Sequence, residues 1–369
     1  MSESNTKAKH LGDIYRTIYY EGPCSRQIIS EKLNLSLPTV TNYLNQLKRQ
    51  HLIYTDGSFH STGGRKANMF FCSPDTRYSI GIDITRNHLS IVIIDLGNKI
   101  VASKRMRISF ADTDEYYNLA ASELEQIITN TKIPKEKLLG AGISLPAIVE
   151  KDQKSISYAT VIEIKPHLYE RIQRIIPYPI LLFNDANSGG LAETWNSPSS
   201  KGEVYLSLSS SVGGATVNGR LIATGNNCRA SEFGHMILIP NGRKCYCGQC
   251  GCVNAYCSAT QLSNFTDGDL KKFFTELKEN VGFRQHFDEY LNYLAVTLHN
   301  LRMCYDCDII LGGNVGAYLD EYLDILREKV LTLTPYETNA DFIRCCLYKT
   351  EAAAAGAALY FVNQFVLNM

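Results

Sequence analysis

Apolar residues in the first 50 positions recur at helical spacing and are separated by short polar breaks. Leu11, Ile14 and Ile18 give a helix over residues 9–20, which Glu21-Gly22-Pro23 ends. Ser25 is placed to cap a second helix and Ser36 a third, with a short turn at Asn34-Leu35 between them. The first 50 residues therefore predict three short helices.

The third helix carries apolar residues on one side and small polar residues on the other. It begins S-x-P-T-V, and Val40, Leu44 and Leu47 are expected to face inward. Two helices joined by a tight turn predict a helix-turn-helix, and a generic three-helix interaction module is the alternative. The outward side chains suit base edges and phosphates, so we take them as candidate DNA contacts: Ser36, Thr39, Thr41, Asn42 and Gln46.

Two β segments, 51–54 and 67–72, follow the third helix and suggest a wing. Between them lies Gly63-Gly64-Arg65-Lys66. Together with the helices this predicts a winged helix-turn-helix that binds double-stranded DNA, with Arg65 and Lys66 as further contacts. Arginine suits a narrow minor groove. A contact between domains is the alternative role for Arg65.

After a linker at Ser73-Pro74-Asp75, the pattern changes to strands. Three strands and an amphipathic helix precede two buried strands, over residues 78–84, 89–95, 99–108, 114–131, 139–145 and 178–183. Antiparallel strands followed by a helix and parallel strands predict an α/β fold of the actin-like or ribonuclease-H-like kind found in sugar kinases.

The second half repeats strands and then turns to helices. Strands are expected at 203–208, 215–217, 308–311 and 341–347, and helices at 269–279, 283–303, 318–329 and 351–365. Asn218-Gly219 predicts a hairpin turn, and Ala352 to Ala358 have side chains small enough for close helix packing. We divide the chain into a head (1–75), lobe one (76–190) and lobe two (191–350), and the final helix, 351–367, returns to lobe one.

Two turns in the body are candidate ligand sites. Asn184 and Asp185 follow a strand end, where open α/β sheets bind ligands, and they can hold sugar hydroxyls. Alternatively, they form an Asx-turn that caps a helix starting at Ser188. The Ser/Gly turn from Ser209 to Gly214 presents backbone N–H groups to an anion or forms a simple hairpin.

The stretch from Glu232 to Ser258 carries the most specific signal. Five candidate ligands lie close together among Gly and polar residues: His235, Cys245, Cys247, Cys250 and Cys252. Four Cys and His ligands with short spacing make the tetrahedral set that Zn²⁺ prefers, and a closed set of four is structural. Free core cysteines are the alternative, which a cluster among Gly, Lys and Gln disfavours.

Composition refines this interpretation. The chain has 369 residues, 12 of them Cys, with 45% hydrophobic residues and no net charge. The first 75 residues hold nine Lys and Arg against six Asp and Glu, which suits nucleic acid at that end. The polar N-terminus predicts no signal peptide, and the absence of an apolar run of about 18 residues predicts no membrane span. We therefore expect a cytoplasmic protein whose thiols bind metal or are buried.

The ordered motifs resemble the ROK family (repressors, open reading frames and sugar kinases), in its repressor branch. They are the winged helix with S-x-P-T-V and GGRK, then GIDI, NDAN, E-F-G-H and C-Y-C-G-Q-C-G-C, and they cover essentially the whole chain. The resemblance implies His235, Cys245, Cys247 and Cys252 as structural zinc ligands, with Cys250 a spare or alternative ligand. It implies sugar contacts at Asn184, Asp185, Glu232 and His235, and it places Asn254 where the family has a sugar-binding Glu.

Departures from the family are equally informative. ROK kinases carry D-x-G-G-T in the first turn, whereas this chain has Asp83-Ile84-Thr85-Arg86-Asn87-His88 without glycine. The second phosphate turn, 209–214, loses two glycines, so we infer that ATP binding and catalysis are lost. Ala147 replaces a usual glycine beside the sugar, and with Asn254 it indicates an unusual, weak or absent effector.

These patterns together predict a sugar-responsive transcriptional regulator, a repressor of carbohydrate-metabolism genes that is not an enzyme. A homodimer, or a tetramer formed by two such dimers, would bind a palindromic operator. Two alternatives stay open at this point. One is a ROK sugar kinase with an attached DNA-binding head, and the other is a constitutive DNA binder with an empty cleft.

Overall fold

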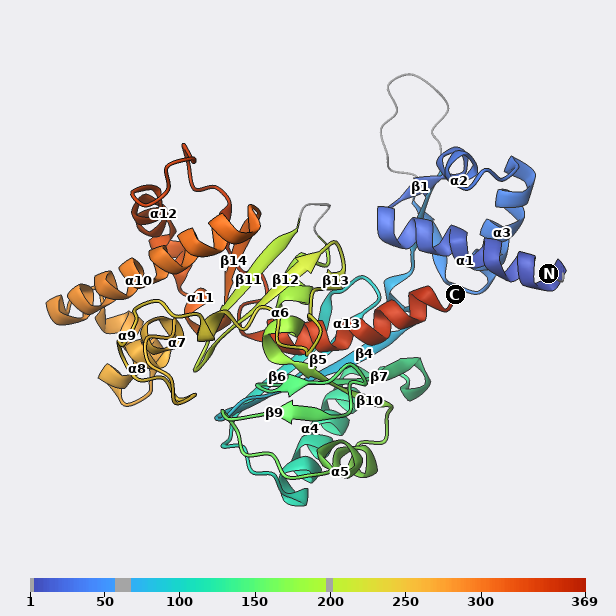
Figure 1. The fold of residues 1–369 in the computed structure, drawn as a ribbon. Helices are drawn as coiled ribbons and strands as arrows, with labels where there is room; N and C mark the ends of the chain where they lie inside the picture. The colour runs from blue at the N-terminus through green and yellow to red at the C-terminus, as the bar shows by residue number, and fades with distance from the viewer. Residues whose placement is uncertain (1–2, 57–67, 197–201) are drawn as a thin grey trace.

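The computed structural model describes residues 3–56, 68–196 and 202–369. It has a helical head and a body of two lobes, each built on its own β-sheet (Figure 1). The final helix runs through the middle of the molecule and ends beside the head. The fold is a winged helix-turn-helix followed by a two-lobed α/β body, as the sequence predicts.

The head contains the three predicted helices, α1 (Glu3–Glu21), α2 (Arg26–Leu33) and α3 (Leu37–Arg49). The Ser25 and Ser36 hydroxyls accept the N–H groups of Ile28 and Thr39, each at 3.3 Å. These side-chain caps satisfy N–H groups that the first turn of a helix leaves without a partner. Asn34, in the turn between α2 and α3, has a φ of 51°, in the left-handed region that asparagine tolerates.

A small sheet completes the head. Strand β3 (Met69–Cys72) pairs antiparallel with β2 (Ile53–Asp56) on one side and with the two-residue β1 (Cys24–Ser25) on the other. The strand β1 was not predicted, because two residues carry no alternation. The helices and the sheet enclose an apolar core that includes Ile14, Tyr15, Ile29, Val40, Leu44, Leu47 and Phe70.

The first lobe is organised by a five-stranded sheet in the order β10-β7-β4-β5-β6. The strands are β4 (Tyr78–Ile84), β5 (His88–Asp95), β6 (Ile100–Arg107), β7 (Leu138–Leu145) and β10 (Ile180–Asn184). The first three are antiparallel and the β4–β7 and β7–β10 pairs are parallel, which confirms the predicted order. Helix α4 (Asp114–Thr131) and the unpredicted α5 (Leu168–Ile175) pack on one face.

The second lobe has a sheet in the order β13-β12-β11-β14-β15. Its strands are β11 (Glu203–Leu208), β12 (Val212–Asn218), β13 (Leu221–Ile222), β14 (Asp308–Gly312) and β15 (Ile343–Cys345). Because β12 begins at Val212, the connecting turn is Ser209 to Ser211, shorter than the predicted 209–214. The hairpin after β12 is confirmed, with Gly219 at a φ of 63°.

Helices cover the outer face of this second sheet, and short segments surround them. The longer ones are α9 (Leu270–Glu276), α10 (Val281–Tyr305) and α12 (Leu323–Leu331), which the 3₁₀ turn η5 (Leu319–Tyr322) precedes. Shorter elements that the sequence did not predict are β8 (Ile148–Val149), β9 (Ile156–Tyr158), η3 (Phe233–His235), α7 (Asn254–Cys257), α8 (Thr260–Ser263), α11 (Gly313–Gly316) and η6 (Lys349–Glu351).

Helices α6 (Asp185–Thr194) and α13 (Ala352–Leu367) lie between the two sheets. A side chain at Gly356 would collide with the Ser188 carbonyl, and one at Gly81 with the Ala354 carbonyl, so the backbones touch. The Ala-rich helix thus packs as closely as predicted. No helix within the described residues is both long enough and apolar enough to cross a membrane.

The C-terminal end of α13 is also part of the head. Val366 belongs to the apolar core of the head, Tyr20 donates a hydrogen bond to Asn363 at 2.6 Å, and Arg16 donates to the Leu367 carbonyl at 3.1 Å. The other end of α13 begins next to the space between the lobes, which Ala352 and Ala353 line. A single helix therefore connects the interlobe space to the head.

Candidate functional site

Helix α3 presents a polar face on the surface of the head. Asn42 and Gln46 are exposed, and Val40, Leu44 and Leu47 are buried beneath them. Three of the predicted DNA contacts also have local structural roles. Ser36 caps the helix, the Thr39 hydroxyl forms a hydrogen bond with the Ser36 hydroxyl at 2.7 Å, and Thr41 donates to the Leu37 carbonyl. Within the described residues, the side chains of Asn42 and Gln46 make no such contacts, so they are available to a partner.

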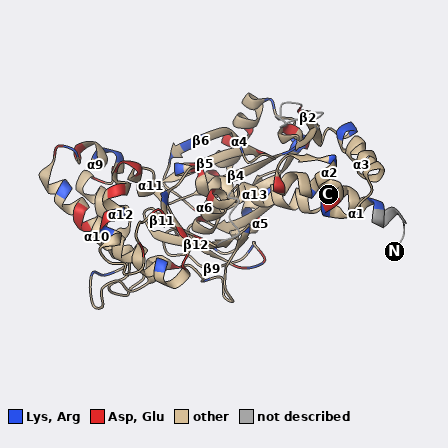
Figure 2. Ribbon diagram, turned by 90° about the horizontal axis from the view of Figure 1, so that it is seen from above, with Lys and Arg blue, Asp and Glu red and all other residues tan. Residues whose placement is uncertain are grey.

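Cationic residues lie near this face. Lys48 and Arg49 at the end of α3 place positive charge on the head, whereas Lys32 at the end of α2 is paired with Glu21 of α1 (Figure 2). Exposed cations beside a polar helix face suit contact with phosphates. The sequence analysis did not single out these three residues. Arg65 and Lys66, predicted at the wing, lie outside the described residues.

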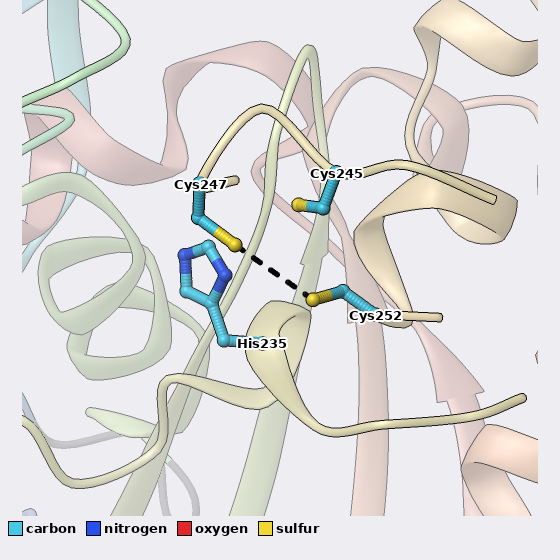
Figure 3. A group of neighbouring side chains, drawn as sticks. All are labelled: His235, Cys245, Cys247 and Cys252. Atoms are coloured by element: carbon cyan, nitrogen blue, oxygen red, sulfur yellow. Dashed lines mark hydrogen bonds between the residues drawn. The ribbon is translucent and has the colours of Figure 1, made fainter. Parts of the chain in front are cut away.

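Four of the five candidate metal ligands converge in lobe two. One donor atom from each of His235, Cys245, Cys247 and Cys252 lies within 4.8 Å of every other, and the four side chains point at a common centre (Figure 3). The sulfur atoms of Cys247 and Cys252 are 3.8 Å apart. Cys250 is exposed and is not in the group. The choice of these four among five candidates agrees with the prediction.

The loop reverses tightly to bring the cysteines together. Gly248 and Gly251 have φ values of 92° and 88°, which L-residues rarely adopt, and Gly251 passes directly against the Ile239 carbonyl. Bridges from Lys244 to Cys250 and from Ile237 to Cys252 hold the two sides of the loop. The two glycines thus permit the tight turns that bring the cysteine side chains together in space.

The donor set fits a metal ion. His235 Nδ1 is buried without a hydrogen-bond partner, although a buried nitrogen normally has one. The other ring nitrogen of His235, Nε2, lies 3.2 Å from the Tyr246 hydroxyl, so it is already engaged. Three thiols and one free imidazole nitrogen form a set that soft or borderline divalent metals bind. The cluster can therefore hold a metal with Nδ1 as the fourth ligand.

A cavity of about 420 Å³ lies beside the metal cluster, between the lobes. Four of the predicted sugar contacts line it: Asn184, Asp185, Glu232 and His235. Asn184 also caps α6, since its Oδ1 accepts the Asn187 N–H at 2.9 Å and its amide donates to the Ala147 carbonyl at 3.1 Å. Helix α6 begins at Asp185, earlier than the start predicted at Ser188.

Asn254, the fifth predicted sugar contact, is not in the lining of this cavity. It is buried, its Oδ1 accepts the Val212 N–H at 2.8 Å, and its amide nitrogen lies 3.8 Å from Cys245 Sγ. The side chain therefore ties the metal loop to the start of β12 and does not point at a ligand. This corrects its expected position, which rested on the glutamate of the family motif.

The carboxyl groups of the cavity are held away from their usual protonation behaviour. Burial, together with the carboxylates of Asp83 and Glu232, raises the pKa of Asp185 to about 7 against the opposing hydrogen bond from the Ala186 N–H. Burial also raises the pKa of Glu232. A group near neutral pKa can accept a hydrogen bond or a proton from a hydroxyl, and such shifts are frequent at functional sites.

A second cavity, of about 380 Å³, adjoins the first and shares Pro146, Val161, Asp185 and Ser211 with it. We call this second cavity the cleft. The turn at Thr85 to His88 forms part of its wall and is closed on itself. The Thr85 N–H donates to the His88 carbonyl at 2.9 Å, and the His88 N–H donates to the Thr85 hydroxyl at 3.0 Å. These N–H groups are therefore not directed at a ligand.

Comparison with protein families identifies the body. The ROK family profile matches residues 79–364, which is most of the chain. The chain belongs to the ROK family. A second profile, described as winged helix-turn-helix DNA-binding, matches residues 9–54, which include α2 and α3. The head of this ROK protein thus carries its own family signature.

The sequence is similar to the xylose repressor of Bacillus spizizenii, with 28% identity over 256 residues. That region covers 68% of this chain and 65% of the repressor, so the match spans a little less than two thirds of that relative. A ROK family transcriptional regulator, a homologue of the E. coli MLC protein, has a similar structure. Its TM-score is 0.72 at 19% identity, over 98% of this chain and 97% of that chain.

A ROK family glucokinase from Streptomyces griseus, solved in complex with glucose and AMPPNP, also has this fold. The TM-score is 0.63 at 20% identity, over 77% of this chain and 98% of the kinase. At such identities the similarity shows the fold alone. Both regulators and kinases therefore share the body of this ROK protein, and the residues of its two cavities must separate the two functions.

The sequence did not indicate several residues that line the cavity beside the metal cluster, notably Arg229, Tyr246 and Tyr158. A signal for Tyr246 exists, because it lies between two metal ligands and must point away from the metal. Arg229 lies three residues before Glu232 on a segment without regular periodicity, and Tyr158 lies on the unpredicted β9. Neither position could be identified from the pattern alone.

Proposed function

We propose that this ROK protein is a sugar-responsive, DNA-binding transcriptional repressor whose body binds a sugar without phosphorylating it. One observation carries the proposal. Helix α13 connects the helix-turn-helix head to a body whose cavity is lined by Asn184, Asp185 and Glu232, side chains that suit the hydroxyl groups of a sugar. The similarity to a xylose repressor and to a ROK regulator supports this assignment. Such a protein acts in the cytoplasm on genes of carbohydrate metabolism.

The head binds DNA through α3. Asn42 and Gln46 are suited to base edges in the major groove, and the cations at the ends of α2 and α3 are suited to phosphates. A homodimer would place two such helices in successive major grooves, about 34 Å apart, on a palindromic operator. Pairing of dimers into a tetramer is compatible with the same arrangement.

The sugar binds between the lobes and changes how they close. Asn184 has one amide N–H left after its two structural bonds, and Asp185 and Glu232 provide acceptors for hydroxyls. Closure would move α13, whose start lines the cleft and whose end is embedded in the core of the head. The sugar can shift operator affinity only by binding one head arrangement more tightly than the other.

Zinc is the metal that the cluster suits best. Three cysteines and one histidine without an open coordination position form a structural site, which would fix the 235–252 loop. Bound zinc supplies a rigid anchor and no reaction chemistry. The chain then holds Glu232 and His235 at the wall of the cavity, and Asn254 ties the same loop to β12.

A sugar kinase with an attached head is the second candidate, because the near-neutral pKa of Asp185 would suit a general base. The closed turn at Thr85 to His88 opposes it, since nucleotide phosphates need free backbone N–H groups or a comparable cradle. We therefore propose a body without catalytic activity.

Two assays on the full chain separate these functions. DNA selected from a random pool by the protein would contain inverted repeats if the dimer proposal holds, and a coupled assay with ATP and a panel of sugars would show no turnover. Robust phosphorylation of a sugar would show that the protein is a sugar kinase and would contradict the proposed repressor. DNA binding that no sugar changes would leave a constitutive binder instead.

A further inference from the structure

Three arginines face the cleft, and none of them has a partner. Arg86, Arg105 and Arg107 line this cavity, and no guanidinium group among them makes an ion pair or hydrogen bond with another described residue. Other arginines of the body are paired, for example Arg171 with Asp112 at 2.7 Å and Arg344 with Glu203 at 3.0 Å. Three unpaired cations at one cavity raise the local potential for an anion.

The fold places these arginines together by register. Strand β6 is the edge of the first sheet, and Arg107 lies opposite His88 on β5, as Arg105 lies opposite Ser90. Residues two apart on a strand share a face, so both side chains are directed to one side. Lys104, between them in sequence, points to the other face and pairs with Glu123 of α4. Arg86 comes from the turn that joins β4 and β5.

Several backbone N–H groups at the cleft and in the adjoining cavity already have acceptors within the protein. The turn at Thr85 to His88 bonds to itself, the Val212 N–H donates to Asn254, and the Asn314 N–H donates to the Ser209 hydroxyl at 3.3 Å. An anion in this space would meet the cationic side chains of Arg86, Arg105 and Arg107, which line the cleft. Guanidinium groups bind phosphate oxygens in a bidentate manner, which makes phosphate the matching anion.

The acidic residues that line the cleft are Asp83, Asp185 and Asp269, and within the described residues none of them forms an ion pair with the three arginines. Asp269 caps α9 through the Lys272 N–H at 2.9 Å, and Asp83 accepts a hydrogen bond from Ser144 at 2.9 Å. Burial raises the pKa of Asp83 to about 6, although the Ser144 hydrogen bond and Arg105 lower it. Lys271 adds a further cation, for which the described residues offer no ion-pair partner, and Lys349 is paired with Asp320.

We propose that the cleft binds the phosphate of a phosphorylated sugar through Arg86, Arg105 and Arg107. The sugar ring would occupy the adjoining cavity at Asn184 and Asp185, because four residues line both spaces and make them continuous. This inference rests on the proposed function for the ring, but the phosphate site stands on the arginines alone. In this proposal the cleft does not bind a nucleotide and instead binds the phosphate group of the effector itself.

Calorimetry with the full chain at low salt tests the inference. Each sugar in a panel is compared with its own 6-phosphate, and inorganic pyrophosphate is titrated separately. We expect pyrophosphate to bind, and at least one sugar phosphate to bind about tenfold or more tightly than its parent sugar, since two charge-assisted contacts are added. Equal affinity for every sugar and its phosphate, or no heat from pyrophosphate, would overturn the proposal.

Variants assign the site. The double substitution Arg105→Gln and Arg107→Gln should remove pyrophosphate binding and the preference for the phosphorylated sugar, and leave the affinity for the parent sugar. Arg174→Gln is the matched control, because Arg174 is exposed on α5 and bonds only to the Glu170 carbonyl of its own helix. Retention of the preference in the double variant would contradict the assignment, provided its circular dichroism spectrum matches the unsubstituted protein.

The same experiment separates this inference from the proposed function. If pyrophosphate binds through the arginines but no sugar or sugar phosphate binds, the sugar-responsive function fails and the anion site stands. If sugars bind and their phosphates gain nothing, the function stands and the anion site fails.

Discussion

The two cavities between the lobes meet at Asp185, yet they differ in what their walls offer. The first presents the carboxyl groups of Asp185 and Glu232 and the amide of Asn184, beside the group formed by His235 and three cysteines. The cleft presents a closed turn and arginines without partners. In the functions proposed above, the first cavity keeps the sugar half of a kinase site, whereas in the cleft arginine side chains take the place of backbone donors at the phosphate half.

This difference shows which parts of a shared fold are constrained. The metal loop depends on glycines with positive φ and on four converging ligands, so few substitutions are tolerated there. The turn at Thr85 to His88 needs only a hydroxyl and a carbonyl to close it. A turn without glycine is therefore compatible with this fold, and in the function proposed above its closure opposes nucleotide binding. Substitutions in the metal loop should therefore have larger effects on stability than substitutions in the turn at Thr85 to His88.

Loss of a metal ligand should have the largest effect. Cys247→Ser should lose the metal and destabilise lobe two, because structural zinc contributes directly to folding. We expect a metal content near zero and a fall in melting temperature of about 10 °C or more, since several kcal/mol are removed. The exposed Cys250→Ser provides the control and should keep the metal. Equal loss in both variants would mean that the ligand set is wrong.

Substitution of Asp185, which lines both cavities, should strongly weaken sugar binding. Asp185→Asn loses an acceptor shared by both cavities, and we expect affinity for the sugar to fall by about a hundredfold, as for a buried charged hydrogen bond. The cleft arginines are untouched, so pyrophosphate should still bind. Sugar affinity that is unchanged in calorimetry would exclude Asp185 from the site.

The same variant should change how stability depends on pH. In the folded protein the pKa of Asp185 is about 7, above its unfolded value, so the folded state holds the proton more tightly. Its contribution to stability is therefore present at low pH and is lost as pH rises towards and through 7. Urea unfolding at pH 5 and pH 8 should show that Asp185→Asn gains stability relative to the unsubstituted protein at pH 8. A gain confined to pH 5 would contradict the sign.

Asn254 should affect stability more than ligand binding. Asn254→Ala leaves the buried Val212 N–H without an acceptor, which costs about 1–3 kcal/mol. Because the side chain does not line the sugar cavity, sugar affinity should change by less than about threefold, within the range of an indirect effect. The exposed Asn292→Ala is the control for urea unfolding. A large loss of sugar affinity without loss of stability would return Asn254 to the site.

Opening the turn of the cleft should have the smallest effect. Thr85→Ala removes the hydroxyl that accepts the His88 N–H, and we expect a loss of about 1 kcal/mol in the free energy of unfolding. Kinase activity should not appear, since the arginines still line the space. Turnover of ATP by this variant would show that the turn alone had blocked catalysis.

The sequence predicted the elements that carry strong periodicity or specific spacing. The caps at Ser25 and Ser36 and the directions of the strands in the first sheet follow from local patterns, whereas the choice of four metal ligands among five candidates came from the family resemblance. Short elements such as β1, β8 and α7 were missed because two to four residues hold no period. The start of α6 was placed too late, since Asn184 serves as a cap and a cavity residue at once.

Positions that depend on distant contacts were harder to predict. Asn254 was assigned to the ligand by its place in the motif, but its partners lie on β12 and at Cys245, far or unpredictable in sequence. The three arginines of the cleft gave no signal, because only the pairing register of β5 and β6 brings them beside the first turn. Register is set by the whole sheet and cannot be read from one strand.

Operator affinity measured with and without the sugar tests the central claim most directly. Fluorescence anisotropy would follow the full chain on DNA selected from a random pool, while the compound that most raises the melting temperature is added to saturation. The account predicts that this compound changes the operator dissociation constant by about tenfold or more, a coupling typical of allosteric proteins, and that Asp185→Asn removes the change. An identical dissociation constant with and without saturating sugar would contradict it.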